Sequence, residues 1–307
     1  MYGRWCGDGM KTFRRLIKIV LIGVPLLVAV FFLFLNLPGV KMETVSEFGV
    51  TFTPTYAESL GVDWREAYRA TLDDLGVRLF RLSAQWKSIE PADNIYAFED
   101  LDFQMDEAAA RGARVLLGVG RKLPRWPECH DPEWVTELSQ AELREKVLKN
   151  VRVVVDRYKN HPALDRWQVE NEVFFPFGIC PYGFDLELLK QEVELVRSLD
   201  QKHKTVVTDS GEWTLWMPIG FVGDVLGISM YREAWNDFFN IHVPFPINEG
   251  WYQLRARLIS PWKKNIIVTE LQAEPWAGMP VAQMTPEEAQ KWMPLEKIQD
   301  NIQFAKN

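Results

Sequence analysis

The chain has 307 residues, of which 47% are hydrophobic and 25% are charged. This composition is typical of a globular protein, and the length is sufficient for one large domain. The net charge of −7 at pH 7 provides no basic field to neutralise phosphate groups, which argues against nucleic-acid binding.

The amino terminus combines a basic segment with an apolar run. Residues 19–35 are uncharged, and at about 17 residues they reach the lower limit for a bilayer span. No small-residue cleavage pattern follows them. We therefore predict a basic cytoplasmic segment over residues 1–18, an uncleaved transmembrane signal anchor over 19–38 and a linker over 39–47, with the remainder outside the cytoplasm. A cleaved signal peptide is the alternative, and a buried helix is less favoured because the run lacks a polar face.

From residue 48 onward, short β-rich runs alternate with helical patterns, which predicts repeated βα units around a parallel sheet. No linker rich in Gly, Ser or Pro divides this region, so residues 48–307 are expected to form one domain. The expected strands are 48–53, 77–83, 114–120, 165–172, 205–209, 225–231 and 265–270. The expected helices are 64–75, 101–111, 140–159, 186–199, 250–258 and 286–306.

The predicted fold class is α/β, a TIM (β/α)8-type barrel that lacks its eighth strand. Seven strands are one fewer than a closed barrel needs. Either residues 40–47 supply a substitute strand, or the domain is truncated at its carboxyl end and the barrel stays open; truncation is favoured. An open barrel would leave unpaired backbone on the first and seventh strands.

The three cysteines fall on two sides of the expected anchor. Cys6 would lie on the cytoplasmic side, whereas Cys129 and Cys180 follow two neighbouring strands of the exported domain. In an oxidising compartment this pair could form a disulfide, with two free thiols as the alternative. Four scattered His residues and the absence of a Cys pair at ligand spacing give no indication of a metal site, and no cofactor is expected.

Two carboxylates, Glu172 and Glu270, close the fourth and seventh expected strands, so both would emerge at the carboxyl-end face of a barrel. A facing pair of carboxyl groups is the minimum equipment for cleaving a glycosidic bond. Glu172 precedes bulky apolar residues that raise a carboxyl pKa, which suits an acid/base. Arg81 and Tyr231, each ending a strand, could keep Glu270 ionised as a nucleophile.

The motifs around these residues resemble those of the clan A glycoside hydrolases, the retaining barrel enzymes that include families 5, 10 and 42. In that clan an Asn-Glu pair ends the fourth strand and a Glu ends the seventh, which matches Asn171-Glu172 and Glu270. An Arg of the second strand and a Tyr of the sixth commonly contact the nucleophile, which matches Arg81 and Tyr231. The resemblance covers about residues 48–276 and implies Glu172 as acid/base and Glu270 as nucleophile.

Two further stretches bear on the family within the clan. The segment around Trp86, Glu90 and Tyr96 and the string WQVENE are similar to family 42 β-galactosidases, whereas VTEL at Glu270 is closer to family 10 xylanases. The clan's eighth strand often contributes a Trp beneath the sugar, and nothing in this chain matches it.

Aromatic, amide and cationic residues near the strand ends are candidates for substrate binding. The loop after the third strand is basic and aromatic, so its side chains could line a sugar subsite or pair with surface carboxylates. Glu170 is expected one layer below Glu172, as a structural ion-pair residue. The substrate-binding candidates are Asn171, Arg81, Tyr231, Trp86, Trp126, Arg121, Trp276 and Trp213, of which Trp276 and Trp213 are the weaker.

These observations predict a membrane-anchored, exocytoplasmic retaining glycosidase that hydrolyses O-glycosyl bonds in β-linked poly- or oligosaccharides. Its expected partners are the glycan and, through the amino-terminal helix, the lipid bilayer. The competing hypothesis is a non-catalytic carbohydrate-binding envelope protein derived from such an enzyme. A scaffold without a carbohydrate role would require the two Glu-ended strands to be coincidental, and fold alone does not exclude it.

Overall fold

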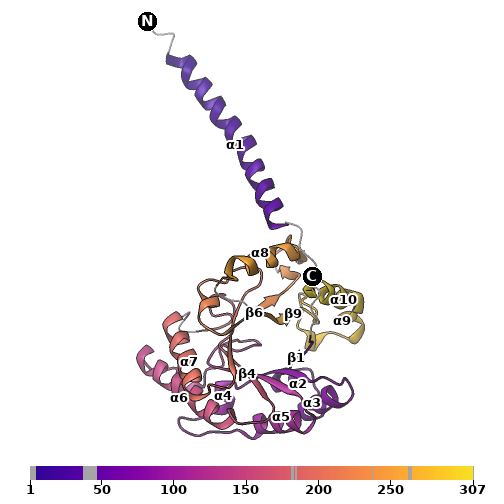
Figure 1. Cartoon of the computed structure of the whole chain (residues 1–307). Coiled ribbons are helices and arrows are strands. Elements are labelled where there is room, and N and C mark those ends of the chain that lie inside the picture. The colour runs from indigo at the N-terminus through magenta and orange to yellow at the C-terminus, as the bar shows by residue number, and fades with distance from the viewer. Residues whose placement is uncertain are drawn as a thin grey trace.

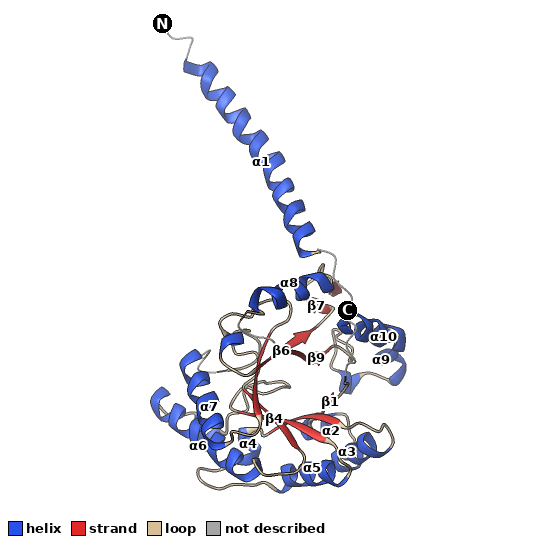
Figure 2. Cartoon of the chain, viewed as in Figure 1, coloured by secondary structure: helices blue, strands red, loops and turns tan. Residues whose placement is uncertain are grey.

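Seven parallel strands form the centre of the computed structural model, which describes residues 5–36, 47–180, 183, 185–236, 238–261 and 265–306. Neighbouring strands pair in parallel throughout, and helices surround them (Figure 2), so the predicted barrel of seven strands is confirmed. In spatial order the strands are β1 (Val50–Thr51), β2 (Leu79–Ser83), β3 (Arg114–Val119), β4 (Leu164–Val169), β5 (Lys204–Asp209), β6 (Val225–Met230) and β9 (Ile266–Leu271).

The helices predicted between these strands are present with small shifts at their ends. Two of them begin at clear sequence signals, since Asp63 caps one helix and Ser139 forms a capping box with Glu142 at another. These helices are α3 (Trp64–Asp73), α5 (Glu99–Ala110), α6 (Gln140–Tyr158), α7 (Leu186–Leu199) and α8 (Glu249–Ile259). The unpredicted short elements are α2 (Pro54–Ser59), α4 (Trp86–Ile89) and three 3-10 turns at Glu133–Val135, Ile219–Phe221 and Val281–Gln283.

The core lies between the strands and the surrounding helices. All six residues of β6 are buried, which is expected of a parallel strand that is covered on both faces. On the β1 and β2 side, Phe80 packs against Tyr68 of α3, and Tyr68 packs against Phe52. This packing holds β2, the strand that carries Arg81, against α3.

The barrel is open between β1 and β9, because no strand joins them within the described ranges. The proposed substitute strand, residues 40–47, lies outside the described part except for Glu47. Figure 1 shows α9 (Pro286–Trp292) and α10 (Leu295–Lys306) on this side of the barrel. The prediction of one helix over residues 286–306 was wrong: Pro294 follows Met293 and disfavours helical backbone at that residue, so the chain forms two helices.

An unpredicted hairpin follows β6. Its strands, β7 (Glu233–Asn236) and β8 (Ile241–Pro244), pair antiparallel. At its base, Glu233 accepts hydrogen bonds from His242 and Lys297, and the His242 ring stacks on Trp292 of α9. These contacts attach the hairpin to the carboxyl-terminal helices.

Helix α1 (Trp5–Leu35) projects from the domain (Figure 1). Its stretch Ile17–Phe34 is long and apolar enough to cross a membrane and is not buried by the rest of the chain. Part of the predicted basic segment, residues 5–18, belongs to the same helix, whereas residues 1–4 and 37–46, which include the end of the expected anchor and the linker, lie outside the described ranges. At the domain end, Phe34 contacts Trp251 of α8 and Asn36 Nδ2 donates to the Pro246 carbonyl at 3.0 Å.

Candidate active site

Glu172 and Glu270 lie at the carboxyl ends of barrel strands, but their backbones differ. Glu270 belongs to β9, whereas Glu172 lies beyond the end of β4 at Val169, so the expected strand over 165–172 was too long. The φ of Glu172 is 42°, in the left-handed region. Its N–H donates to Thr208 Oγ1 at 2.9 Å, and its carbonyl accepts from Lys122 Nζ at 2.9 Å. These two bonds hold the turn that presents the Glu172 side chain.

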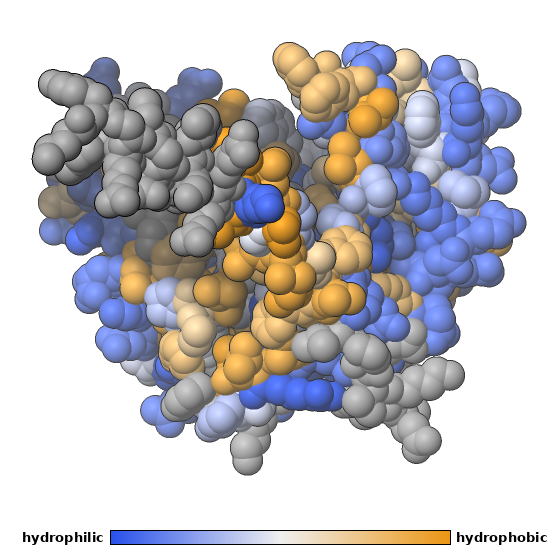
Figure 3. Space-filling model, turned by 90° about the horizontal axis from the view of Figure 1, so that it is seen from above, coloured by the Kyte–Doolittle hydropathy of each residue, from blue (hydrophilic) through white to orange (hydrophobic). Residues whose placement is uncertain are grey.

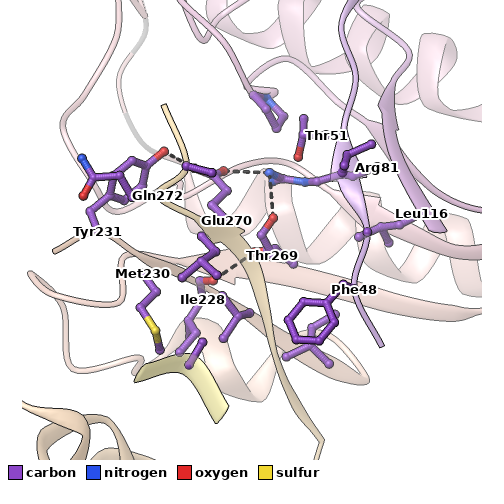
Figure 4. A pocket seen from close by; sticks show the side chains of 18 of the residues that line it. Phe48, Thr51, Arg81, Leu116, Ile228, Met230, Tyr231, Thr269, Glu270 and Gln272 are labelled. Carbon is purple, nitrogen blue, oxygen red and sulfur yellow. Dashed lines mark hydrogen bonds and ion pairs between the residues drawn. The ribbon is translucent and has the colours of Figure 1, made fainter. Parts of the chain in front are cut away.

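The carboxylate of Glu270 has a donor on each oxygen (Figure 4). Arg81 Nη1 donates to Oε1 at 2.8 Å, and the Tyr231 hydroxyl donates to Oε2 at 2.9 Å. Burial raises the pKa of Glu270, but the Arg81 charge and the bonds from Arg81 and Tyr231 outweigh it and hold the pKa below the ordinary 4.5. Glu270 is therefore ionised at neutral pH.

Tyr231 keeps its proton beside this carboxylate. Burial, followed by the charge of Glu270, raises the pKa of the Tyr231 hydroxyl well above its ordinary value. The phenol therefore remains a hydrogen-bond donor to Glu270 at neutral pH.

Glu172 occupies the opposite environment. The residue is buried, and its Oε1 has no hydrogen-bond partner. Burial and the charge of Glu270 raise the pKa of Glu172 to about 8, against the lowering effect of a hydrogen bond from Ser229. At neutral pH this carboxyl group is therefore mostly protonated and can donate.

Asn171 connects the two halves of the site. Its Oδ1 accepts from Arg81 Nη2 at 2.7 Å and from Thr208 Oγ1 at 3.0 Å. Its Nδ2 donates to Glu128 Oε2 at 3.2 Å. Asn171 thus orients Arg81, which in turn donates to Glu270.

Glu128 is a third carboxyl group of the site, which the sequence analysis missed. Burial, then the charge of Glu270, raises the pKa of Glu128 to about 7. Its φ of 72° is left-handed, and a Cβ on Gly178 would lie 2.5 Å from the Glu128 Cβ, so a glycine is needed there. Its position beside the predicted disulfide cysteine, Cys129, was the signal available in the sequence.

A disulfide joins the loops that follow β3 and β4. Cys129 and Cys180 are bonded with a Cα separation of 5.2 Å. Within the same pair of loops, Glu170 accepts from the backbone N–H groups of Arg121 and Lys122, both at 2.7 Å, where a side-chain ion pair was expected. The disulfide and these bonds fix the backbone around Glu128 and Glu172.

Aromatic side chains surround the mouth of the site. Tyr231 and Trp276 stack with ring centroids 4.6 Å apart, and exposed Trp126 contacts Phe177. These four residues line a cavity of about 1200 Å³ that contains Glu270 and continues down the open side between β1 and β9. The cavity therefore has an aromatic mouth beside the charged Glu270.

Two predicted substrate-binding residues lie elsewhere. Trp86 is 1% exposed, and its Nε1 donates to Glu90, so its ring is part of the core. Arg121 is buried and forms an ion pair with Asp131. The structure thus places both side chains in the packed interior, outside the lining of the cavity that contains Glu270. Trp213 is exposed and packs against Phe245, outside the cavity lining.

The described residues contain no group of three or more His, Cys, Asp or Glu side chains that could hold a metal ion.

Comparison with known proteins shows that the chain is similar to β-glycosidases. No protein-family model matches the chain. A beta-galactosidase of Geobacillus kaustophilus is 31% identical over 115 residues, which are 32% of this chain and 17% of that protein. Beta-galactosidase GanA of Bacillus subtilis is 26% identical over 188 residues, 54% of this chain and 24% of that protein. The matches thus span about a quarter or less of these relatives.

Solved structures share the fold. A GH5_18 protein from Streptomyces cattleya, solved with GlcNAc, has a TM-score of 0.55 at 17% identity and covers 83% of this chain and 67% of its own. Xylanase 10B from Thermotoga maritima has a TM-score of 0.52 at 16% identity, with 78% and 77% covered. In sequence and in fold, the chain is a relative of the clan A glycoside hydrolases.

Proposed function

We propose that the protein hydrolyses β-linked glycosides with retention of anomeric configuration, with Glu172 as acid/base and Glu270 as nucleophile. The observation that carries the proposal is the difference in the surroundings of these two carboxyl groups, since Glu172 is buried with no hydrogen-bond partner for Oε1 among the described residues, whereas Glu270 accepts from Arg81 and Tyr231. Burial keeps a proton on Glu172, whereas Arg81 and Tyr231 keep Glu270 ionised. A pair with separated pKa values is the arrangement that assigns the acid and the nucleophile.

The reaction then proceeds in two displacements. In the first, a Glu270 oxygen attacks the anomeric carbon while Glu172 gives its proton to the glycosidic oxygen, and the alcohol leaves. In the second, the Glu172 carboxylate takes a proton from water, whose oxygen attacks the anomeric carbon and releases Glu270. Two inversions restore the original configuration.

The aromatic mouth supports a glycan as the substrate. Trp126 and Trp276 present ring surface at the cavity, and such rings pack against the apolar faces of sugars. Arg125 and Glu274, which form an ion pair at 2.6 Å, add polar groups beside them for hydroxyls. The named activity of the sequence relatives makes β-galactosides the first substrates to test.

Helix α1 is proposed as a single-pass anchor, with the amino terminus inside and the barrel outside the cytoplasm. Basic residues before the apolar stretch support this orientation. The Cys129–Cys180 disulfide supports an oxidising compartment for the domain.

The test uses the full chain in detergent micelles with a panel of aryl β-glycosides. Glu172→Gln is expected to reduce kcat/KM by about 10²- to 10⁴-fold, the usual contribution of an acid/base. Glu270→Gln is expected to abolish turnover, and Glu137→Gln, at an exposed position, serves as the matched control. Proton NMR of the first-formed sugar reports the anomeric configuration.

Chemical rescue separates the two roles. Azide should restore turnover in Glu270→Ala and give the α-glycosyl azide, whereas the same anion in Glu172→Ala should give the β-glycosyl azide. Substantial activity in either Gln variant would overturn the assignment. Sugar binding without turnover by the unaltered chain would instead support the non-catalytic carbohydrate-binding protein.

A further inference from the structure

An exposed apolar surface surrounds the point at which α1 meets the domain. It comprises the β7–β8 hairpin and the loop after β5, and we call it the aromatic face. Figure 3 looks down on the end of the molecule from which α1 projects, and hydrophobic residues run across the middle of this view, where α1 lies over the domain. The residues of the aromatic face are Trp213, Leu215, Phe238, Phe239, Ile241 and Val243, all of which are exposed.

The hairpin turn places two adjacent phenylalanines, Phe238 and Phe239, between polar Asn236 and Asn240. Phe238 is 87% exposed and Phe239 is 65% exposed, and their rings contact each other. The turn is held in place, because the N–H of Phe239 donates to Asn236 Oδ1 at 2.9 Å. An ordered, projecting pair of phenyl rings of this kind is typical of an interaction site.

The aromatic face lies next to the end of α1. Asn36, just beyond the apolar stretch, donates to the carbonyl of Pro246, which lies two residues after β8. Trp213 packs against Phe245 in the same segment. A hairpin strand rises about 3.4 Å per residue, so the turn at Phe239 lies within about 25 Å of Pro246. If residues 17–34 span the bilayer, the base of the hairpin lies at the level of its outer interface.

We propose that the aromatic face inserts into the outer interface of the lipid bilayer that α1 crosses, so that the barrel lies on the membrane. This inference rests on the anchoring role proposed for α1. Leu215, Ile241 and Val243 have no group to hydrogen-bond sugar hydroxyls, which favours lipid over a glycan as the occupant. Burying large apolar side chains away from water is favourable, and the net charge of −7 gives no basis for attraction to anionic lipids. The contact is therefore apolar and independent of lipid charge.

The experiment places a nitroxide on Phe238→Cys in the full chain with Cys6→Ser, in single-copy phosphatidylcholine nanodiscs. Power saturation in electron paramagnetic resonance compares the access of two relaxing agents to the nitroxide. One is oxygen, which concentrates in lipid, and the other is a water-soluble nickel chelate. Glu145→Cys on α6, away from α1 in Figure 1, is the matched control. The ratio of oxygen to nickel access is expected to be several-fold higher at position 238 than at 145, and unchanged when anionic lipid is added.

The outcomes separate the two proposals. If the chain does not float with liposomes, the anchor fails and this inference fails with it. If it floats while the label at 238 is as open to nickel as the label at 145, the aromatic face is not in the membrane and only this inference fails. Protection that requires two copies in one disc, or that follows addition of an oligosaccharide, would overturn it in favour of self-association or a sugar subsite.

Discussion

At the scale of single residues, Glu172 and Glu270 carry the same functional group in opposite surroundings. Glu172 is buried and its Oε1 has no hydrogen-bond partner among the described residues, whereas Glu270 has Arg81 and Tyr231 as donors. The electrostatic difference arises because the segments that carry Arg81, Tyr231 and Glu270 converge at one face of the barrel. It yields a prediction for the pH dependence of activity.

The pH profile of kcat/KM should be bell-shaped and wide. The acid must hold its proton, so activity is expected to fall as pH rises through about 8, the pKa of Glu172. The nucleophile must be ionised, so activity is expected to fall at the acidic end only below 4.5, because the pKa of Glu270 is lowered. Initial rates from pH 3 to pH 10 at sub-saturating substrate check both limbs. An alkaline limb centred near the ordinary carboxyl pKa would contradict the proposed acid.

Glu128→Gln should move the alkaline limb without destroying the site. The charge of Glu128 helps to raise the pKa of Glu172, so its removal lowers that pKa and shifts the limb to lower pH by up to about one unit. Glutamine keeps an oxygen that accepts the bond from Asn171. The same rate profile measures the shift, with Glu137→Gln as control. An unmoved limb would mean that Glu128 does not act on Glu172.

Residue identity predicted part of this site. Arg81 lies within β2 and Tyr231 directly follows β6, and the parallel topology brings both toward Glu270. Trp86 could not be placed, because a strand-end position does not say whether the chain then turns toward the cavity or toward the helices. Glu128 depends on a left-handed backbone in a loop, for which residue types give a weak signal.

At the scale of elements, the loops after β3 and β4 act as one unit. The carboxylate of Glu170 binds two backbone N–H groups of the neighbouring loop, and the disulfide closes the same pair of loops. A Cβ on Gly120 would lie 2.4 Å from Glu170 Oε1, so this position requires glycine. Together these features hold the backbone of the two loops that carry Glu128 and Glu172.

Removal of the disulfide should destabilise the domain markedly. Its cysteines are 51 residues apart, and loop-closure entropy for that separation gives about 4 kcal/mol. Cys129→Ser with Cys180→Ser is therefore expected to lower the free energy of unfolding by about this amount, measured by urea titration in micelles. Cys6→Ser, which leaves the bridge intact, is the control. Equal stability of the double variant and the control would show that the bridge contributes little.

Element prediction succeeded where periodicity was long and failed where elements were short. Helix α7 agrees with its predicted bounds, since a capped amphipathic run of this length has few alternatives. The β7–β8 hairpin was missed because its strands have four residues each and lack the Asn-Gly turn signal. The break between α9 and α10 was also missed, although Pro294 disfavours helical backbone at the residue before it.

At the scale of the whole molecule, a barrel with one open side is joined to a long apolar helix. The number and order of barrel strands could be predicted, because each βα unit repeats the same pattern and parallel connections restrict the topology. The position of the domain relative to α1 could not, since it depends on two contacts of Asn36 and Phe34 with segments far away in the sequence.

The open side between β1 and β9 has a kinetic consequence if the proposed chemistry holds. In the second displacement, a water molecule must reach the glycosyl-enzyme while the sugar still fills the mouth. The cavity that contains Glu270 extends down this side of the barrel, so solvent has a lateral route to the ester that the sugar does not block. Such a route shortens the lifetime of the covalent intermediate and favours its capture by water over transfer to a second sugar.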